Sequence, residues 1–274
     1  MSNFFDNIKH HLTVGSFFLK LSIQLQLEYP AFLIGWFFAN GLQFLAGLMI
    51  LKFLMDKFQF INGWSFGQIA FMYGIGAISH ALAIIFFIQT WSIEYRVTEG
   101  RFDTMLLRPL SIYFQFATEY INLIGLTDLL PGMIIFIYGI NAVGFQFTFG
   151  NFFAVLFIIL GATFIRGAIY TFTGSIAFWT KRSYHLIPIN NMIFEKTIMY
   201  PTTIFGNAVQ WVLTFLFPLA FVAFYPASYL LNMDMGLNIP GPIPVWTFFI
   251  GIIMLFLSVL LFHLGLKKYD GAGS

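Results

Sequence analysis

Long uninterrupted apolar segments alternate with short polar stretches along the whole chain. A helix needs about 20 mainly apolar residues to cross the hydrocarbon core of a membrane, and six segments reach this length. They cover approximately residues 31–51, 66–91, 113–143, 152–179, 205–225 and 246–266. Strands of a membrane barrel are about half as long and alternate between apolar and polar positions, which these segments do not. The pattern therefore predicts an all-α membrane protein with six transmembrane helices.

The N-terminal residues 1–30 have a different pattern. Phe4, Ile8 and Leu12 recur every four residues, as they do on one face of a helix. We expect an amphipathic helix that lies at the membrane interface with its apolar side in lipid; the alternative is a frayed polar terminus. This segment also lacks the charge pattern and cleavage site of a signal peptide, so the first spanning helix is expected to remain in the mature protein.

Lysine and arginine are unequally divided between the two sides of a six-span topology. Lys52 and Lys57 fall on one side, and ten basic residues fall on the other. The ten are Lys9, Lys20, Arg96, Arg101, Arg108, Lys181, Arg182, Lys196, Lys267 and Lys268. Because short cytoplasmic loops are enriched in Lys and Arg, both termini are predicted to be cytoplasmic. The proline-rich loop 226–244 is then external.

The composition supports a single membrane domain over residues 1–274. Hydrophobic residues make up 59% of the chain and charged residues only 9%, against about 25% charged residues in an ordinary soluble domain. The chain has no cysteine, which excludes disulfides and thiolate metal sites. A net charge of +2 gives no argument for nucleic acid as a partner.

No sequence motif indicates covalent, metal-assisted or nucleotide chemistry. The chain has no GxxxxGK[ST] phosphate loop, no GxSxG elbow and no HExxH pair. His80 and His263 each stand alone in an apolar segment. A single histidine in such a segment is more often a packed, hydrogen-bonded side chain than a metal ligand. We therefore assign no catalytic residue, no metal ligand and no cofactor to this chain.

Two ionisable residues fall deep in the predicted spans. Asp128 lies midway along the third span and Arg166 midway along the fourth. A charge at the centre of a bilayer costs at least about 2.5–3.5 kcal/mol and is expected to find a partner or a water-filled cavity. Since the two spans are consecutive and antiparallel, we expect an Asp128–Arg166 pair. It would serve either as a gate or substrate-facing charge, or as a contact that sets helix register.

The loop from Ser92 to Pro109 is the most charged stretch of the protein. Its charged residues are Glu94, Arg96, Glu99, Arg101, Asp103 and Arg108. Its apolar residues are Ile93, Val97, Met105, Leu106 and Leu107, and Gly100 permits a sharp break. We expect a short amphipathic helix on the cytoplasmic surface that docks to a protein partner. The alternative is a solvated interhelical loop.

Three stretches together resemble the permease subunits of ABC-2 type transporters. They are Glu99-Gly100 followed by Leu106-Leu107-Arg108-Pro109, the segment FPLAFVAFYPASYLL from Phe217 to Leu231, and the tail GLKKYDGAGS. The resemblance implies a chain integral to the cytoplasmic (inner) membrane of a prokaryote, paired with a second permease chain, the same or a paralogue. It also implies a separate ATP-binding cassette subunit that carries ATP and Mg and binds a coupling helix from Glu94 to Arg108. Before the last span, the family usually has a re-entrant segment.

The prediction for function is thus a permease subunit of an ATP-driven exporter that does no hydrolysis itself. The resemblance suggests lipids, polysaccharides, peptides or drugs as cargo. The translocation cavity is expected between spans one, two and five, with Asn40, Gln43, Asn207 and Gln210 as lining residues or as interhelical hydrogen-bonding groups. The alternatives are a secondary transporter, which would need inverted repeats and broken helices, and an intramembrane enzyme, which would need clustered catalytic groups.

Overall fold

The computed structural model describes residues 2–58, 60–108, 111–237 and 239–269, and within these it describes no side chain of residues 2–12, 51, 54 and 58. The expected periodicity of Phe4, Ile8 and Leu12 therefore lies outside the described side chains. The described chain is built from helices, and its only β-type pairing is an isolated bridge between Ile61 and Trp64.

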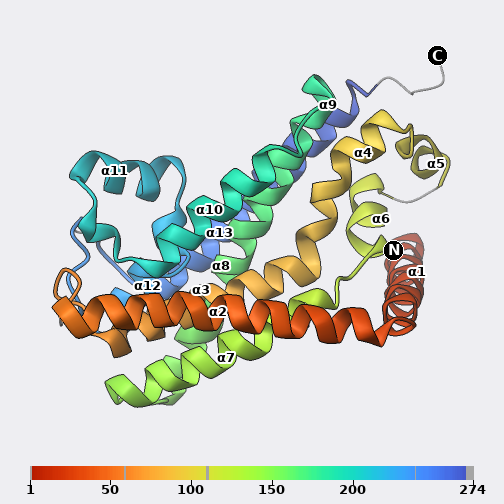
Figure 1. Ribbon diagram of the computed structural model, residues 1–274. Helices are drawn as coiled ribbons and strands as arrows, with labels where there is room; N and C mark the ends of the chain where they lie inside the picture. The colour runs from red at the N-terminus through yellow and green to blue at the C-terminus, as the bar shows by residue number, and fades with distance from the viewer. Residues whose placement is uncertain (1, 59, 109–110, 238, 270–274) are drawn as a thin grey trace.

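Five helices of the described chain are long and apolar enough to cross a membrane. They are α2 (Pro30–Phe58), α3 (Phe66–Phe87), α7 (Ile124–Val143), α8 (Phe149–Ser175) and α13 (Ile243–Leu266). The short elements η1 (Ile88–Ser92), α4 (Ile93–Thr98), α5 (Phe102–Leu106), α9 (Ala177–Thr180) and α10 (Leu186–Met199) connect or flank them. In Figure 1, α4, α5, α6 and α9 gather at the same end of the molecule as α1.

The N-terminal segment forms one helix, α1 (Ser2–Leu27), which stands roughly perpendicular to α2 in Figure 1. This is the relative orientation that a helix lying in the membrane plane would have next to a spanning helix. Ser22 and Gln26 near its end reach residues far along the chain. The Ser22 hydroxyl donates to the carbonyl of Ile121 at 3.0 Å, and the Gln26 side-chain oxygen accepts from the backbone of Leu123 at 2.7 Å.

The third predicted span, 113–143, is not one helix, and the contacts of Ser22 and Gln26 lie at the point where it is broken. The structure divides it into α6 (Ile112–Glu119) and α7, with a non-helical break between them. Ser22 and Gln26 of α1 bond to some of the backbone groups freed at the break. The Asn122 side chain accepts from the amide of Ile124, and the carbonyl of Ile85 in α3 accepts from the amide of Asn122. A helix can be interrupted in a membrane protein when neighbouring polar groups re-satisfy its backbone in this way.

The predicted fifth span, 205–225, is not a single spanning helix either. The short helix η2 (Thr202–Ile204) comes just before it. The run itself is divided into short pieces, which are α11 (Asn207–Trp211), the π-helical turn η3 (Val212–Leu216), η4 (Leu219–Phe221) and the start of α12 (Phe224–Leu230). The Thr214 and Tyr225 hydroxyls, 2.7 Å apart, hydrogen-bond to each other and join η3 to α12. The apolar run from Pro218 to Ser228 is buried inside the protein, so its hydrophobicity reflects the protein core and not contact with lipid.

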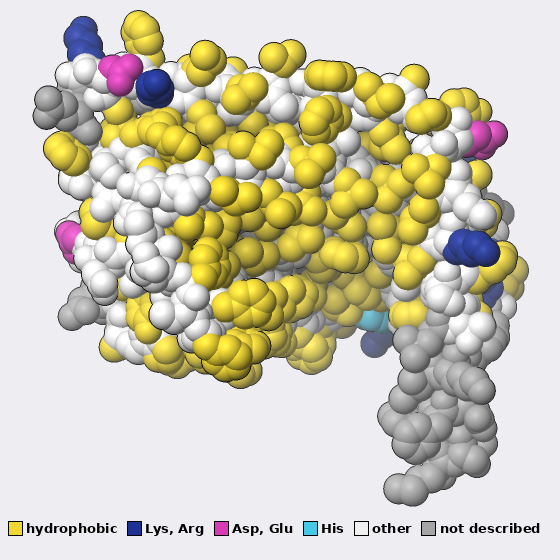
Figure 2. All heavy atoms as spheres, turned by 90° about the horizontal axis from the view of Figure 1, so that it is seen from below, with side chains coloured by type: hydrophobic (Ala, Val, Ile, Leu, Met, Phe, Trp, Pro, Cys, Tyr) yellow, Lys and Arg dark blue, Asp and Glu magenta, His cyan; other side chains and the backbone are white. Residues whose placement is uncertain are grey.

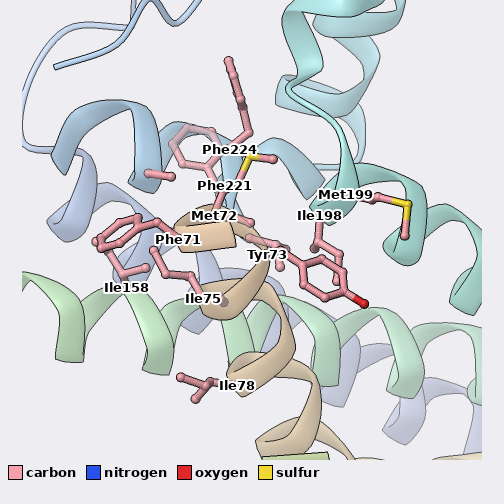
Figure 3. Packing of buried hydrophobic residues seen from close by; sticks show 14 of the residues in the cluster. Phe71, Met72, Tyr73, Ile75, Ile78, Ile158, Ile198, Met199, Phe221 and Phe224 are labelled. Carbon is pink, nitrogen blue, oxygen red and sulfur yellow. The ribbon is translucent and has the colours of Figure 1, made fainter. Parts of the chain in front are cut away.

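Helix α3 is the centre of this core. Ser65 begins it with a capping box, in which its hydroxyl accepts from the Gln68 amide and the Gln68 side chain accepts from the Ser65 amide. Phe71, Met72, Tyr73 and Ile75 then pack on surrounding elements. Figure 3 shows them against Phe221 and Phe224 from the broken segment, Ile158 from α8, and Ile198 and Met199 from α10.

Helices α8 and α13 approach each other at glycines. A Cβ atom at Gly161 would lie 2.5 Å from the carbonyl oxygen of Thr247, and one at Gly251 would lie 2.5 Å from the carbonyl oxygen of Gly161. Small residues at such crossings let two helix backbones come into direct contact, which is the usual source of helix association in membranes. The pairing leaves the outer side of α13 exposed and apolar, as lipid contact requires.

The surface has the pattern of a membrane protein. Figure 2 shows the side seen from below in Figure 1, where hydrophobic side chains cover most of the described area and the charged groups lie near its ends. Exposed apolar residues of this kind include Phe53 in α2 and Ile134 in α7. The direction from one charged end to the other therefore marks the membrane normal.

Candidate functional site

A cavity of about 410 Å³ opens between α2, α3, α7, α8 and α10. This is within the size range of small-molecule sites, about 300–1,000 Å³. Its lining is aromatic and apolar with a few polar groups. The lining residues are Trp36, Asn40, Gln43, Phe44, Tyr73, His80, Ile84, Ile88, Trp91, Ile124, Asp128, Arg166, Asn191, Phe194, Glu195 and Ile198.

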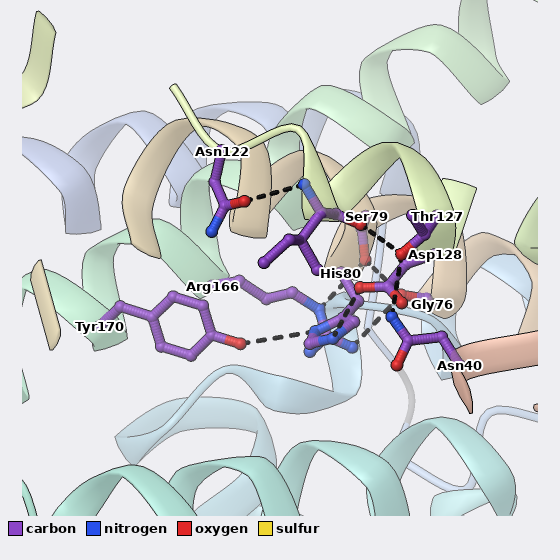
Figure 4. Close-up of polar contacts among 10 residues, drawn as sticks. Asn40, Gly76, Ser79, His80, Asn122, Thr127, Asp128, Arg166 and Tyr170 are labelled. Carbon is purple, nitrogen blue, oxygen red and sulfur yellow. Dashed lines mark hydrogen bonds and ion pairs between the residues drawn. The ribbon is translucent and has the colours of Figure 1, made fainter. Parts of the chain in front are cut away.

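Arg166 is part of the cavity wall but is buried in the protein, with only 1% of its surface exposed. Its Nε donates to the Ser79 hydroxyl at 3.1 Å and its Nη2 donates to the Gly76 carbonyl at 3.3 Å. The guanidinium carbon also lies 4.3 Å from the ring centre of Phe194, which is the geometry of a cation–π contact. Figure 4 shows the side chain extended from α8 across the face of α3.

Asp128 meets a different partner, so the expected Asp128–Arg166 ion pair is not formed in the described structure. Its Oδ2 lies 3.9 Å from the Nε2 of His80, a residue of α3, as Figure 4 shows. The other ring nitrogen of His80 lies 3.5 Å from the Tyr170 hydroxyl. The physical reason is that α7 and α8 follow each other in sequence but both pack on α3, which supplies the partners of both charges. Both residues nevertheless line the same cavity.

Only two of the four predicted lining residues line the cavity. Asn40 and Gln43 of α2 do so, and Asn40 also donates to the Thr127 hydroxyl at 3.0 Å, which ties α2 to α7 beside Asp128. Asn207 and Gln210 do not, because their segment is the broken one. Asn207 is exposed, and Gln210 donates to the carbonyl of Phe205 at 2.8 Å.

Sequence reasoning missed α10, which forms one wall of the cavity. The stretch 181–201 falls between the predicted spans 152–179 and 205–225, and its two prolines, Pro188 and Pro201, favour a connector over a helix. In the structure, Pro188 lies in the first turn of α10, where a missing amide does no harm, and Pro201 follows its C-cap residue Tyr200. The two prolines mark the ends of a helix, and the buried Phe194 and Ile198, four residues apart, mark its inner face.

The charged loop forms two short helices, α4 and α5, separated by Gly100 with a positive φ of 68°. The expected single amphipathic helix is thus broken at the predicted glycine. Phe102 anchors the loop in an aromatic cluster, with its ring centre 5.4 Å from that of Phe178 and 6.0 Å from that of Phe262. Ile93, Val97 and Met105 are buried in the same cluster.

The predicted docking residues fall into two groups. Glu94 and Arg96 bond within the chain. The Glu94 carboxylate accepts from the backbone amides of Ser183 and Tyr184, and Arg96 Nη1 lies 2.6 Å from Glu119 Oε2. The second group is exposed, and we call it the tip of the loop. Its predicted docking residues are Glu99, Arg101, Asp103 and Arg108, and the tip also includes the exposed Thr104, Leu106 and Leu107, which were not among the predicted docking residues. Gly100, also predicted to dock, is half-buried between α4 and α5.

The tip has an apolar surface as well as charge. Leu106 is 52% exposed and Leu107 is 87% exposed, although the tip lies at the charged end of the molecule. Arg101 lies over the ring of Tyr95, with its guanidinium carbon 4.8 Å from the ring centre, and donates to the Tyr95 hydroxyl. Paired arginine and exposed leucine side chains on a structured support are features of protein-binding surfaces.

Within the described residues, no group of three or more His, Cys, Asp or Glu side chains is arranged to hold a metal ion. The acidic groups Asp128 and Glu195 and the imidazole of His80 share the cavity. Their arrangement supports binding of a ligand by charge and shape, and we derive no covalent step from it.

Comparisons with known proteins agree with this arrangement. No curated protein and no solved structure gives a significant match to the chain. A family model described as "ABC-2 family transporter protein" matches residues 42–273. That match takes in every spanning helix but the first part of α2, together with the charged loop and every residue of the cavity lining except Trp36 and Asn40. The chain therefore belongs to the ABC-2 transporter family and is a membrane-embedded transporter protein.

Proposed function

We propose that this chain is the permease subunit of an ATP-driven exporter in the cytoplasmic membrane, with both termini on the cytoplasmic side. The observation that carries the proposal is a chain of contacts from the loop tip to the cavity wall. The tip is supported by α4, Glu94 of α4 holds the backbone of Ser183 and Tyr184, and those residues lead directly into α10. A push on the tip is thereby passed to Phe194 and Glu195.

A second set of contacts runs from the same loop to α6 and α1. Arg96 is bonded to Glu119 at the end of α6, and the break after α6 is held by Ser22 and Gln26 of α1. The loop is thus tied to both sides of the cavity, since α7 begins at that break and carries Asp128. Movement of the loop would change the separation of α7 and α10, which is the two-state behaviour that transport requires.

The energy source in this proposal is a separate ATP-binding cassette subunit, which carries ATP and Mg and docks on the tip. A second permease chain, identical or a paralogue, completes the translocation path, and membrane lipid surrounds both. The tip combines exposed leucines with charged side chains, as a surface that binds a protein does. Neither the cavity nor the tip has the features of a nucleic-acid site.

The experiment is affinity purification of the chain from its host membranes, scored for a co-purifying chain with a nucleotide-binding loop and for ATP hydrolysis. Leu107→Asp should lower recovery of that chain at least about tenfold, since an exposed apolar contact would be replaced by a charge. Lys57→Glu, an exposed change at the opposite end, is the matched control and should leave recovery unchanged.

Glu94→Ala separates docking from transmission. Because the tip remains intact, the ATPase chain should still bind, but transport per ATP hydrolysed should fall since α4 no longer holds the residues before α10. Transport by the purified chain alone, driven by an ion gradient and independent of ATP, would instead show a secondary transporter and would refute the proposal.

A further inference from the structure

The cavity contains two carboxylates that have no strong cationic partner. The side chain of Asp128 is only 8% exposed, and the nearest basic atom, His80 Nε2, lies 3.9 Å away, which is too far for a hydrogen bond. Glu195 lies on α10 and makes no ion pair or hydrogen bond within the described chain. The buried Asp128 carboxylate is expensive unless a counter-charge is present, and the exposed Glu195 carboxylate is open to a ligand in the cavity.

The basic group of the cavity is already occupied by the protein. Arg166 donates to Ser79 and Gly76 and stacks on Phe194, and it lies within 4.0 Å of neither carboxylate. Its 1% exposure leaves little surface for a ligand. An anion would have to displace these contacts, whereas a cation would meet Asp128 and Glu195 directly.

The walls of the cavity also suit a cation. Trp36, Phe44, Tyr73 and Trp91 line it together with Phe194, and aromatic faces attract organic cations as well as apolar groups. Asn191 lines the same space, and its side-chain oxygen is buried without a hydrogen-bond partner in the described structure. That oxygen is an acceptor available to an ammonium group.

We propose that this cavity binds an amphipathic organic cation, with its positive centre between Asp128 and Glu195 and its apolar body against the aromatic walls. The volume of about 410 Å³ accommodates one such molecule. The inference rests on the proposed function, because it names the class of cargo that the permease takes. It concerns ligand binding by this chain alone and needs no ATPase subunit.

The test is equilibrium dialysis of radiolabelled tetraphenylphosphonium against the purified full chain in detergent. Glu195→Gln and Asp128→Asn should each weaken binding at least about tenfold, because each removes one negative charge from the lining of the cavity. Glu28→Gln and Asp56→Asn change exposed acidic groups that do not line the cavity. They are the matched controls and should stay within about twofold of the unmodified chain.

Tetraphenylborate supplies a second comparison, since it has the same shape and the opposite charge. Dialysed on its own, because the two ions precipitate together, radiolabelled tetraphenylborate should bind at least about tenfold more weakly than the phosphonium. Dodecyltrimethylammonium, a single-tailed cation, should displace the bound phosphonium. A lower inhibition constant for the single-tailed cation indicates a lipid-like cargo, and a lower one for unlabelled tetraphenylphosphonium indicates a compact cargo.

Equal binding of tetraphenylborate, dialysed on its own, would overturn the proposal. So would unchanged binding in Glu195→Gln, whose exposed side chain makes no contact that folding requires. Because no ATPase chain is present, a negative result here leaves the proposed permease function standing, and the co-purification experiment judges that function separately.

Discussion

At the scale of single residues, the membrane domain organises its charges around α3. Arg166 is among the largest fully buried side chains of the protein, and it donates hydrogen bonds to Ser79 and Gly76 of α3. His80, one residue further along α3, is the neighbour of Asp128. One helix therefore supplies the partners of two opposite charges, and both charged residues lie in the wall of the same cavity.

Arg166→Lys should be costly although it keeps the charge. A lysine ammonium cannot reproduce the planar fork that reaches Ser79 and Gly76 together, and hydrogen bonds to charged groups are worth about 1.5–3 kcal/mol each. We expect a clearly lower midpoint of thermal unfolding in detergent, measured by intrinsic fluorescence. Arg182→Lys, at an exposed site, is the control. Equal midpoints for the two variants would contradict this role of Arg166.

At the scale of elements, glycine decides which helices touch. The α8–α13 crossing depends on Gly161 and Gly251, where no Cβ fits. The α3–α7 crossing has the same character, because a Cβ at Gly74 would lie 2.5 Å from the Cα of Phe136. These crossings hold α3 against α7, which carries Asp128, and α8, which carries Arg166, against α13.

Gly251→Ala should therefore destabilise the protein by about 1–3 kcal/mol, the usual cost of forcing an extra carbon into a packed contact. Gly35→Ala is the matched control, since Gly35 lies in helix α2 with nothing within 4 Å of its would-be Cβ. The control should be neutral or slightly stabilising, because alanine favours helix more than glycine does by about 1 kcal/mol. Thermal unfolding midpoints of both variants decide the matter, and a smaller loss for Gly251→Ala than for Gly35→Ala would show that the crossing is not tight.

At the scale of the whole molecule, charge and packing agree on two ends and a lipid-facing middle. The charged loop, the start of α1 and the end of α13 gather at one end, and the turn after α2 and the broken segment gather at the other (Figure 1). The cavity lies between these ends, with α10 connecting it to the loop.

The absence of native cysteine permits a direct test of the proposed orientation. Thr104→Cys at the tip and Lys57→Cys at the opposite end are both exposed. In intact spheroplasts, a membrane-impermeant maleimide should label Lys57→Cys and should label Thr104→Cys only after the membrane is opened. The reverse pattern would invert the topology.

Much of the fold was predictable because lipid imposes long apolar runs. Four of the six predicted spans lie within or overlap a spanning helix, namely 31–51, 66–91, 152–179 and 246–266. The short connector after the first span turns at Asn62 and Gly63, which both have positive φ. The run 205–225 was wrong for a physical reason. Its second part, 218–225, is buried inside the protein, and hydropathy does not separate a segment buried in protein from one buried in lipid. Its first part is apolar and largely exposed, but its helical stretch, Asn207–Leu216, is too short to span a membrane.

The site was only partly predictable for a related reason. The sequence singled out Asn40, Gln43, Asp128 and Arg166 because polar groups are rare in spans and stand out there, and all four line the cavity. A role of this cavity in transport stays a prediction. Glu195 and Phe194 were missed because α10 was taken for a connector. The predicted Asp128–Arg166 pair was wrong because two spans that are consecutive in sequence, here α7 and α8, both pack on α3.

Local chemistry by itself determined that the chain is a helical membrane protein, which end of it carries the charged loop, and where a glycine breaks that loop. These properties depend on solvent, backbone hydrogen bonding and turn geometry, all of which act over a few residues. Tertiary structure alone decided that α3 lies between α7 and α8, that α10 closes the cavity, and that Glu94 joins the loop to α10. Such contacts depend on which helices pack together, and that is settled by shape complementarity across the whole chain.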